Sequence, residues 1–282
     1  MKIVITGGTG AMAKPGILYF LDQSDVKEIL ITGRTKKKVD EAVAWFKNDR
    51  VKGMVLDLMD IEACAKAFEG ADVVYNAAYL STCLSVTTAA LKAGANYVDL
   101  GGNSHWDQMK MHDDFIKIGK TAVLGLGTAP GMSAMMPAVV IENMDSVDTI
   151  EIKDICKNMV PHSEHSRPLH WGYSLEGILD EVSMDAPILI DGKVEWHPAR
   201  SFKEYVEFLP PAGGGKVGIT IHPEVEMFVH SWTKKGLKNA SWKIGFEEDF
   251  EQKLRFLASL GLAHPDNKIV YNGQEICPRD VV

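Results

Sequence analysis

The sequence predicts an α/β protein in two parts, a parallel-sheet domain over residues 1–128 and an α+β domain over residues 129–282. Up to about residue 125, short apolar runs alternate with helix-like stretches, which is typical of a parallel sheet with right-handed crossovers. After Thr128 this alternation stops, and strand-like runs are separated by long polar loops rich in Pro, His and Gly. A chain of 282 residues has room for two domains of ordinary size.

Each element of the first domain follows from its apolar spacing. The first strand is a short apolar run, and the helix after it extends to about Leu21. A second helix places Val39, Val43 and Phe46 on one face. The expected strands are residues 2–6, 28–32, 54–56, 72–76, 97–100 and 122–125, with the later helices at 36–47, 62–68 and 82–93. In the second domain we expect strands at residues 149–155, 188–190, 217–221 and 241–246.

A glycine loop joins the first strand to the first helix and fits the pattern G-x-G-x-x-G/A. In that pattern the first glycine allows a tight turn, the second lets backbone approach a pyrophosphate, and the small last residue lets helix pack on strand. The helix N-terminus then offers free N–H groups to phosphate. Because the loop follows a strand and opens a βαβ unit, it predicts a Rossmann dinucleotide site rather than an unliganded turn. Its residues are Gly8, Thr9, Gly10, Ala11, Met12 and Ala13.

The end of the second strand indicates which dinucleotide is bound. NAD-binding domains usually place an acid there for the ribose 2′-hydroxyl, but this chain has Gly33 followed by Arg34 and Thr35. A 2′-phosphate would find a bidentate partner in Arg34, with Thr35 or Lys36 beside it. NADP is therefore the predicted cofactor and NAD the alternative, unless the lysines that follow are only a solvated helix start.

Two further segments are assigned to the cofactor from topology alone. Asp57 and Leu58 follow the third strand, where the adenine would pass. The fourth strand ends in Asn76, Ala77 and Ala78, where ribose and nicotinamide would lie.

Composition excludes several classes of partner. The formal net charge is −8, so nucleic acid is a poor candidate. No apolar run approaches the roughly 20 residues of a membrane span. The strand at residues 2–6 leaves no room for a signal peptide before it. Four scattered cysteines without a Cys-x-x-Cys fit a reducing cytoplasm and argue against both a disulfide framework and a cysteine-rich zinc site. We therefore expect a cytoplasmic protein with a small-molecule substrate and no metal.

The catalytic signatures of several enzyme classes are missing. None of the seven tyrosines has a lysine four residues later, so the Tyr-x-x-x-Lys of short-chain dehydrogenases is absent. Four other segments do resemble a known family, the saccharopine dehydrogenase-like family, and most closely its lysine 6-dehydrogenase branch. They are residues 97–102 (YVDLGG), 126–132 (LGTAPGM), 173–177 (YSLEG) and 277–282 (CPRDVV).

This resemblance implies a Rossmann domain followed by a substrate and dimerisation domain, and hence a homodimer. It implies NAD(P)-linked hydride transfer at a carbon–nitrogen bond of an amino acid, through an imine. Two departures stand out. Gly33 replaces an acid that lysine 6-dehydrogenases usually carry, and the family usually continues past the Pro-Arg-Asp-Val motif, so the second domain is expected to be shortened at its C-terminus.

Imine chemistry needs a proton donor or acceptor and an anchor for the substrate carboxylate. Asp99, at the end of a predicted strand, is the first acid–base candidate, against the alternative of a turn aspartate. His170 and Tyr173 are further candidates, in what we interpret as a mobile loop rather than a zinc site. The substrate candidates are Gly131 and Met132 for backbone contacts at the domain junction, Glu176 for an ammonium group, and Arg167 and Arg200 for the carboxylate.

The rival interpretations are a non-catalytic NADP-binding protein that acts as a sensor, and a shortened member of the family that serves as a scaffold. The glycine loop fits each of them.

Overall fold

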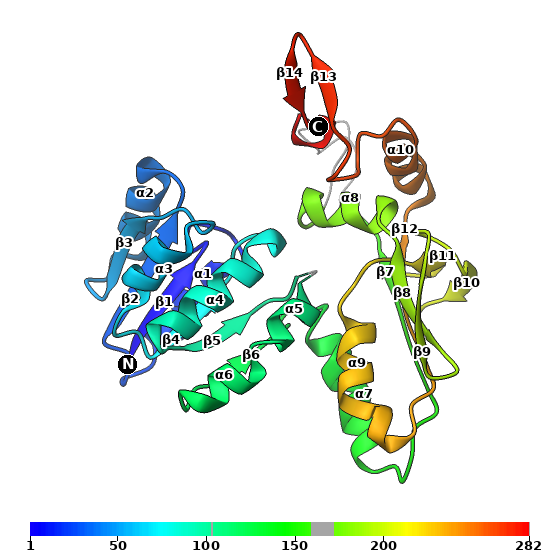
Figure 1. The fold of residues 1–282 in the computed structure, drawn as a ribbon, viewed down its shortest axis with the longest axis horizontal. Coiled ribbons are helices and arrows are strands. Elements are labelled where there is room, and N and C mark those ends of the chain that lie inside the picture. The colour runs from blue at the N-terminus through cyan, green and yellow to red at the C-terminus, as the bar shows by residue number, and fades with distance from the viewer. Residues whose placement is uncertain (103, 159–171, 282) are drawn as a thin grey trace. The chain divides into compact units, whose positions relative to one another are not determined.

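The computed structural model describes residues 1–102, 104–158 and 172–281. The chain divides into two compact units, Met1–Met132 and Ser133–Val282. Figure 1 shows the first in blue to green and the second in green to red. Each unit is described by itself. None of the helices in the described ranges is long and apolar enough to cross a bilayer.

The first unit is built on a parallel sheet of six strands in the order β3-β2-β1-β4-β5-β6. This is the strand order of a dinucleotide-binding fold, with the order reversing between β1 and β4. The strands are β1 (Lys2–Thr6), β2 (Glu28–Gly33), β3 (Val51–Val55), β4 (Val73–Asn76), β5 (Asn96–Asp99) and β6 (Ala122–Val123).

Helices cover both faces of this sheet, and one buried apolar cluster lies on each face. On one face Ile3, Ile5 and Ile31 pack against Ala13 and Ile17 of the first helix. On the other, Val4 and Val74 pack against helices that follow β3 and β4. The helices are α1 (Ala13–Leu21), α2 (Lys36–Phe46), α3 (Ile61–Phe68), α4 (Cys83–Ala93), α5 (His105–Met109) and α6 (His112–Lys117), with the short η1 (Leu80–Thr82) before α4.

The second unit holds a largely antiparallel sheet in the order β10-β11-β12-β8-β9, with β7 pairing parallel to β12. Its strands are β7 (Thr149–Cys156), β8 (Ala186–Ile190), β9 (Lys193–His197), β10 (Glu204–Glu207), β11 (Gly214–Ile219) and β12 (Asn239–Phe246). Its helices are α7 (Met132–Glu142), α8 (Leu175–Ser183), α9 (Glu224–Trp232) and α10 (Glu248–Ser259), with η3 (Thr233–Lys235) after α9. A hairpin of β13 (Ile269–Tyr271) and β14 (Gln274–Ile276), drawn in red in Figure 1, precedes η4 (Pro278–Asp280).

The predicted fold class is confirmed. All six strands expected in the first domain form, although β3 begins at Val51 rather than at residue 54. The four strand-like runs expected later correspond to β7, β8, β11 and β12. β9 and β10 and the helices of the second unit were not predicted, because their short or irregular apolar patterns carry little periodicity.

Candidate functional site

The glycine loop turns sharply between β1 and α1. Gly7 has a φ of +66°, a left-handed conformation that L side chains rarely adopt, and Gly10 N–H donates to Gly7 O at 2.9 Å. The turn therefore depends on Gly7, one residue before the motif, rather than on Gly8 as the motif suggested. Gly8 is required for a different reason, since a Cβ there would lie 2.5 Å from Cβ of Ile31.

The N-terminus of α1 is available to an anion. Met12, the residue before the helix, makes no side-chain capping hydrogen bond and is 61 % exposed. The first N–H groups of a helix have no partner within the helix, and they carry partial positive charge. Because Gly10 and Ala11 add little bulk, the loop leaves these groups open, as a phosphate-binding turn requires.

The end of β2 cannot accommodate an acid. A Cβ on Gly33 would lie 2.8 Å from Cγ2 of Thr9 and 3.0 Å from Cγ2 of Val39. Glycine at this position is therefore a packing requirement of the loop against α2. The next residue, Arg34, is exposed, and its guanidinium lies over the ring of Tyr79 at 5.6 Å. Thr35 precedes α2 and makes no side-chain capping hydrogen bond. Of the following lysines, Lys36 is paired with Asp40 at 2.7 Å.

The residues assigned to the adenine and ribose take different positions. Asp57 is exposed, and its carboxylate accepts from Met59 N–H at 3.0 Å within its own turn. Leu58 is half-buried and packs against the core cluster of Val4. Asn76 is only 1 % exposed and acts within the fold, since its Oδ1 accepts from the Thr6 hydroxyl at 2.6 Å and from Ala78 N–H at 3.1 Å.

Ala77 and Ala78 lie directly against the glycine loop. A Cβ on Gly7 would be 2.7 Å from Cα of Ala78 and 2.8 Å from the carbonyl oxygen of Ala77. Asn76 thus supports the loop through the backbone of these two residues. The uncapped helix end, the glycines without room for a side chain and the exposed Arg34 together fit a dinucleotide with a 2′-phosphate.

Asp99 ends β5 in the interior of the first unit, with no exposed surface. One carboxylate oxygen accepts from Gly101 N–H at 3.0 Å and Gly125 N–H at 2.7 Å. The other accepts from the Tyr97 hydroxyl at 2.9 Å and the Gln108 amide at 2.8 Å. The carboxylate thus joins the loops that follow β5 and β6, and this geometry favours a structural role over proton transfer to a substrate. Burial, then Asp99 and Cys83, raise the pKa of Tyr97 well above its usual value, so the phenol stays a donor.

The loop from Gly127 to Met132 folds back on itself. Gly127 and Gly131 form an isolated bridge, and a Cβ on Gly131, whose φ is +132°, would lie 2.0 Å from Gly127 O. Met132 N–H donates to that same oxygen at 3.1 Å. We expected this N–H to be open to a substrate, but it is occupied by this hydrogen bond. The Met132 side chain is 54 % exposed and Gly131 is buried.

Arg200 was expected to anchor a substrate carboxylate, and the structure contradicts this. Its side chain is 2 % exposed, and Nε and Nη2 donate to the two carboxylate oxygens of Glu251 at 3.2 and 2.7 Å. Nη1 donates to Gly218 O at 3.1 Å and to Ile244 O. A guanidinium with these partners is a structural ion pair between the β9–β10 loop and α10.

A buried cluster of titratable groups lies in the second unit, and sequence reasoning found only one of its members. Tyr173, half-buried just before α8, donates its hydroxyl to Oε2 of Glu181 at 2.7 Å. Burial raises the pKa of Glu181 from 4.5 to about 7, although His222, the Tyr173 hydroxyl and Arg200 act to lower it. Burial, together with Glu181, also raises the pKa of Tyr173 far above its usual value.

His222 belongs to the same cluster and acts to lower the pKa of Glu181. It lies between β11 and α9, stacks on Trp242 with ring centroids 4.4 Å apart, and is hydrogen-bonded to Glu224. Burial alone would lower the pKa of His222, but Glu224 and Glu181 raise it above 6.5. Glu224 also accepts from the Ser133 hydroxyl at 2.6 Å. The residue types alone gave no signal of this cluster, because no motif spacing connects α8 with the start of α9.

Three other predicted site residues are Glu176, His170 and Arg167. Glu176 lies half-buried in the first turn of α8, where its carbonyl oxygen accepts from Arg279 at 2.9 Å. His170 and Arg167 lie outside the described residues. Within the described ranges, no group of three His, Cys, Asp or Glu side chains is placed to hold a metal ion.

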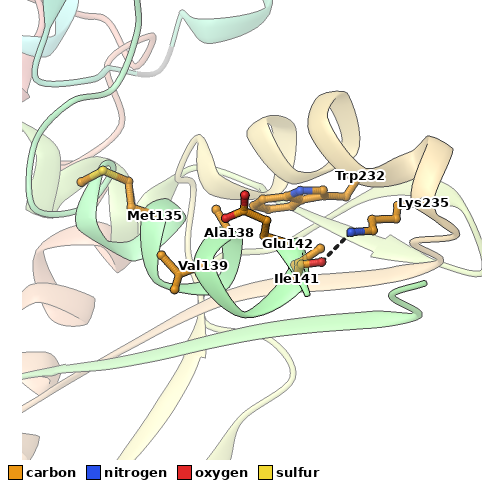
Figure 2. Close-up of a pocket in the computed structure, with 7 residues that line it drawn as sticks. All are labelled: Met135, Ala138, Val139, Ile141, Glu142, Trp232 and Lys235. Atoms are coloured by element: carbon orange, nitrogen blue, oxygen red, sulfur yellow. Dashed lines mark hydrogen bonds between the residues drawn. The ribbon is translucent and has the colours of Figure 1, made fainter. Parts of the chain in front are cut away.

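An open groove of about 460 Å³ runs along α7 and the end of α9. Figure 2 shows Met135, Val139 and Trp232 along it, with the Lys235 ammonium donating to Ile141 O. Apart from Glu142 and Lys235 its lining is apolar, and it contains none of the predicted site residues. We therefore do not place the active site in this groove.

Comparison with known proteins agrees with this geometry. Residues 3–123 match the family model of the saccharopine dehydrogenase NADP binding domain. The first unit is thus similar to the NADP-binding domain of saccharopine dehydrogenases. The predicted resemblance to this family is supported over residues 3–123, and the matched domain type binds NADP, in agreement with the predicted cofactor. The lysine 6-dehydrogenase branch stays a prediction.

Similar proteins match most of the chain. A carboxyaminopropylagmatine dehydrogenase of Synechocystis sp. is 26 % identical over 99 % of this chain and 70 % of its own length. A carboxynorspermidine synthase of Vibrio alginolyticus is 23 % identical over 75 % of this chain and 52 % of its own length. The solved apo saccharopine dehydrogenase (L-Glu forming) of Saccharomyces cerevisiae shares the fold, with a TM-score of 0.68 at 17 % identity, over 94 % of this chain and 59 % of the yeast chain. The chain thus spans between about half and 70 % of these relatives.

Proposed function

We propose that this protein is an NADP-dependent oxidoreductase that acts on a carbon–nitrogen bond of a carboxylated amine, through an imine. The observation that carries the proposal is the nucleotide site, in which an open helix end and the exposed Arg34 fit a 2′-phosphorylated dinucleotide. When bound, NADP would accept a hydride from the amine carbon, or donate one to the imine.

The substrate class is supported by residues and relatives of different kinds. The sequence favoured an amino acid, and the two curated relatives are named for amines of the polyamine type that carry a carboxyl group. Both substrate kinds present an ammonium and a carboxylate. We retain Glu176 for the ammonium and Met132 and Gly131 for substrate contacts, whereas Arg200 is no longer a candidate for the carboxylate.

Tyr173 is the residue we propose for proton transfer. An amine must lose a proton as its carbon gives up a hydride, and an imine must gain one in the reverse direction. The Tyr173 hydroxyl is a half-buried donor with a carboxyl group behind it. Asp99, by contrast, we assign to holding the two loops at the end of the sheet.

The test is NADP⁺ reduction with a panel of amines, namely saccharopine, lysine, carboxynorspermidine and carboxyaminopropylagmatine. We expect turnover with at least one of them and with NADP⁺ in preference to NAD⁺. Tight NADP⁺ binding without turnover across the panel would instead support a non-catalytic NADP-binding sensor. The homodimer implied by the family is tested separately by sedimentation, where a mass of 31.0 kDa would contradict it.

A further inference from the structure

The hydroxyl of Tyr173 donates a hydrogen bond to Oε2 of Glu181, with the two oxygens 2.7 Å apart. A proton can pass along this hydrogen bond. Glu181 is 5 % exposed, so among the described residues solvent reaches this carboxyl only poorly. Tyr173 is half-buried and lies nearer the surface. We infer that Glu181 acts as a positioning residue that takes up and returns the proton of the carbon–nitrogen reaction through the hydroxyl of Tyr173, an inference that rests on the proposed function.

The tyrosine cannot do this by itself. Its raised pKa, caused by burial and the neighbouring Glu181, means that a tyrosinate does not persist near neutral pH. A proton given by the hydroxyl must therefore be replaced in the same step, and a proton received must be passed on. Glu181 is the hydrogen-bonded group that does so, since its carboxyl exchanges a proton near pH 7.

The surroundings keep Glu181 able to exchange its proton. From the β11–α9 loop the His222 imidazolium faces it, and from the β9–β10 loop the Arg200 guanidinium, both favouring the carboxylate. On its own helix Asp180, paired with Arg279 of η4, favours the protonated form. His222 and Arg200 thus oppose burial, which favours the protonated form of Glu181.

Among the described residues, two groups of β7 also act on Tyr173 or Glu181. Asp154 raises the pKa of Tyr173 and of His222. Cys156 has a pKa raised to about 12 by burial, Asp154 and Glu181, so it stays a neutral thiol. Within this part of the structure, Glu181 is the group whose raised pKa lies near neutral pH.

The proton balance fixes the sign of the effect. In the oxidative direction the substrate ammonium loses one proton and its carbon loses one hydride, which leaves an iminium of the same charge. Glu181 must be ionised to accept that proton, so kcat/KM rises as pH rises through about 7. In the reductive direction the protonated form is needed and the dependence reverses.

The experiment is a pH profile of kcat/KM for the full-length protein with NADP⁺ and the amine turned over best, from about pH 5 to about pH 9. For the wild type we expect kcat/KM to rise with pH near pH 7, and we call this rise the limb of the profile. Glu181→Gln should lower kcat on the order of 100-fold with a small change in KM, and should lose the limb. Tyr173→Phe keeps the Glu181 carboxyl but removes the hydroxyl that connects it to the substrate, so this variant should also lose the limb. It replaces Glu181→Gln in the test if Glu181→Gln does not fold.

Matched variants separate this role from a merely structural one. Asp180→Asn removes a buried carboxylate on the same helix and should shift the limb to lower pH without abolishing it, because Asp180 raises the pKa of Glu181. His222→Gln should shift the limb to higher pH. A limb that survives unchanged in Glu181→Gln would overturn the inference.

A second readout needs no turnover. Infrared difference spectra of the cofactor-free protein should show a protonated-carboxyl band that disappears as pH rises through about 7 and is missing in Glu181→Gln. Absence of this band from the wild type would overturn the inference alone. A wild type with the band but without turnover on any amine would overturn the proposed function, and with it the catalytic use of Glu181.

Discussion

Arg34 is the residue on which we propose that the choice between NADP and NAD depends. It follows Gly33, where a Cβ would meet Thr9 and Val39 at 3.0 Å or less. Its guanidinium lies over the ring of Tyr79. Arg34→Ala should weaken NADP binding by about tenfold or more while NAD binding changes little, because only NADP carries the 2′-phosphate that Arg34 would contact. Fluorescence titration of both nucleotides measures the two constants.

The control for Arg34 is Arg255→Ala, which removes an exposed arginine from α10 of the second unit. It should leave both affinities unchanged. Equal weakening of NAD and NADP by Arg34→Ala would contradict a role at the 2′-phosphate.

Asp99 has its effect on stability. Asp99→Asn presents N–H donors to groups that now donate to the carboxylate, leaving Tyr97 or Gln108 without an acceptor. We expect the free energy of unfolding to fall by about 2 kcal/mol, measured by urea denaturation. Asp57→Asn, at an exposed turn carboxylate, is the control and should change it little. An equally stable Asp99→Asn protein with lost turnover would reinstate the catalytic assignment.

Glu181 should make the protein less stable as pH rises. The folded state holds its proton up to about pH 7, whereas an unfolded chain releases it near 4.5. The contribution is therefore present below about pH 4.5 and is lost on the way to about pH 7, amounting to about 3 kcal/mol at most. Urea denaturation at several pH values should show this slope in the wild type and a shallower one in Glu181→Gln. The raised pKa of His222 acts in the same direction, with its contribution lost at higher pH.

Among the elements, the glycine loop is the one whose sequence and structure correspond most closely. Its position after β1 and before α1 follows from the pattern, but the structure assigns the turn to Gly7 and the close packing to Gly8. A pattern records which positions are small, whereas the reason for each depends on the neighbour that approaches it. Here that neighbour is Ile31 of β2.

Gly8→Ala should displace the loop from β2, because its Cβ would meet Ile31 at 2.5 Å. We expect a loss of about 1–3 kcal/mol in stability and weaker NADP binding. Gly172→Ala is the matched control, since a Cβ there meets none of the described residues within 4 Å. Thermal unfolding with and without NADP compares them, and a Gly8→Ala variant as stable and as tightly binding as the wild type would contradict the packing argument.

At the level of the complete chain, the two units have separate apolar cores, each formed from residues of one unit. Ligand binding stabilises the part of a protein that it contacts. NADP alone should therefore slow hydrogen exchange in the first unit, most at residues 7–13 and 33–36, and much less in the sheet of β7 and β12. Exchange measured by mass spectrometry checks this, and equal protection of both units would contradict it.

Local patterns along the chain were enough to predict the alternating strands and helices of the first unit, the glycine loop and the missing acid at Gly33, and the parallel sheet follows from the order of these elements. The roles of Asp99, Arg200 and Glu181 became clear only from the folded chain. Arg200 meets a carboxylate 51 residues away, and His222 lies in a different loop from the helix that carries Glu181. Whether a charged side chain is a free anchor, a buried ion pair or a proton carrier depends on such distant partners and on burial, which no spacing along the chain records.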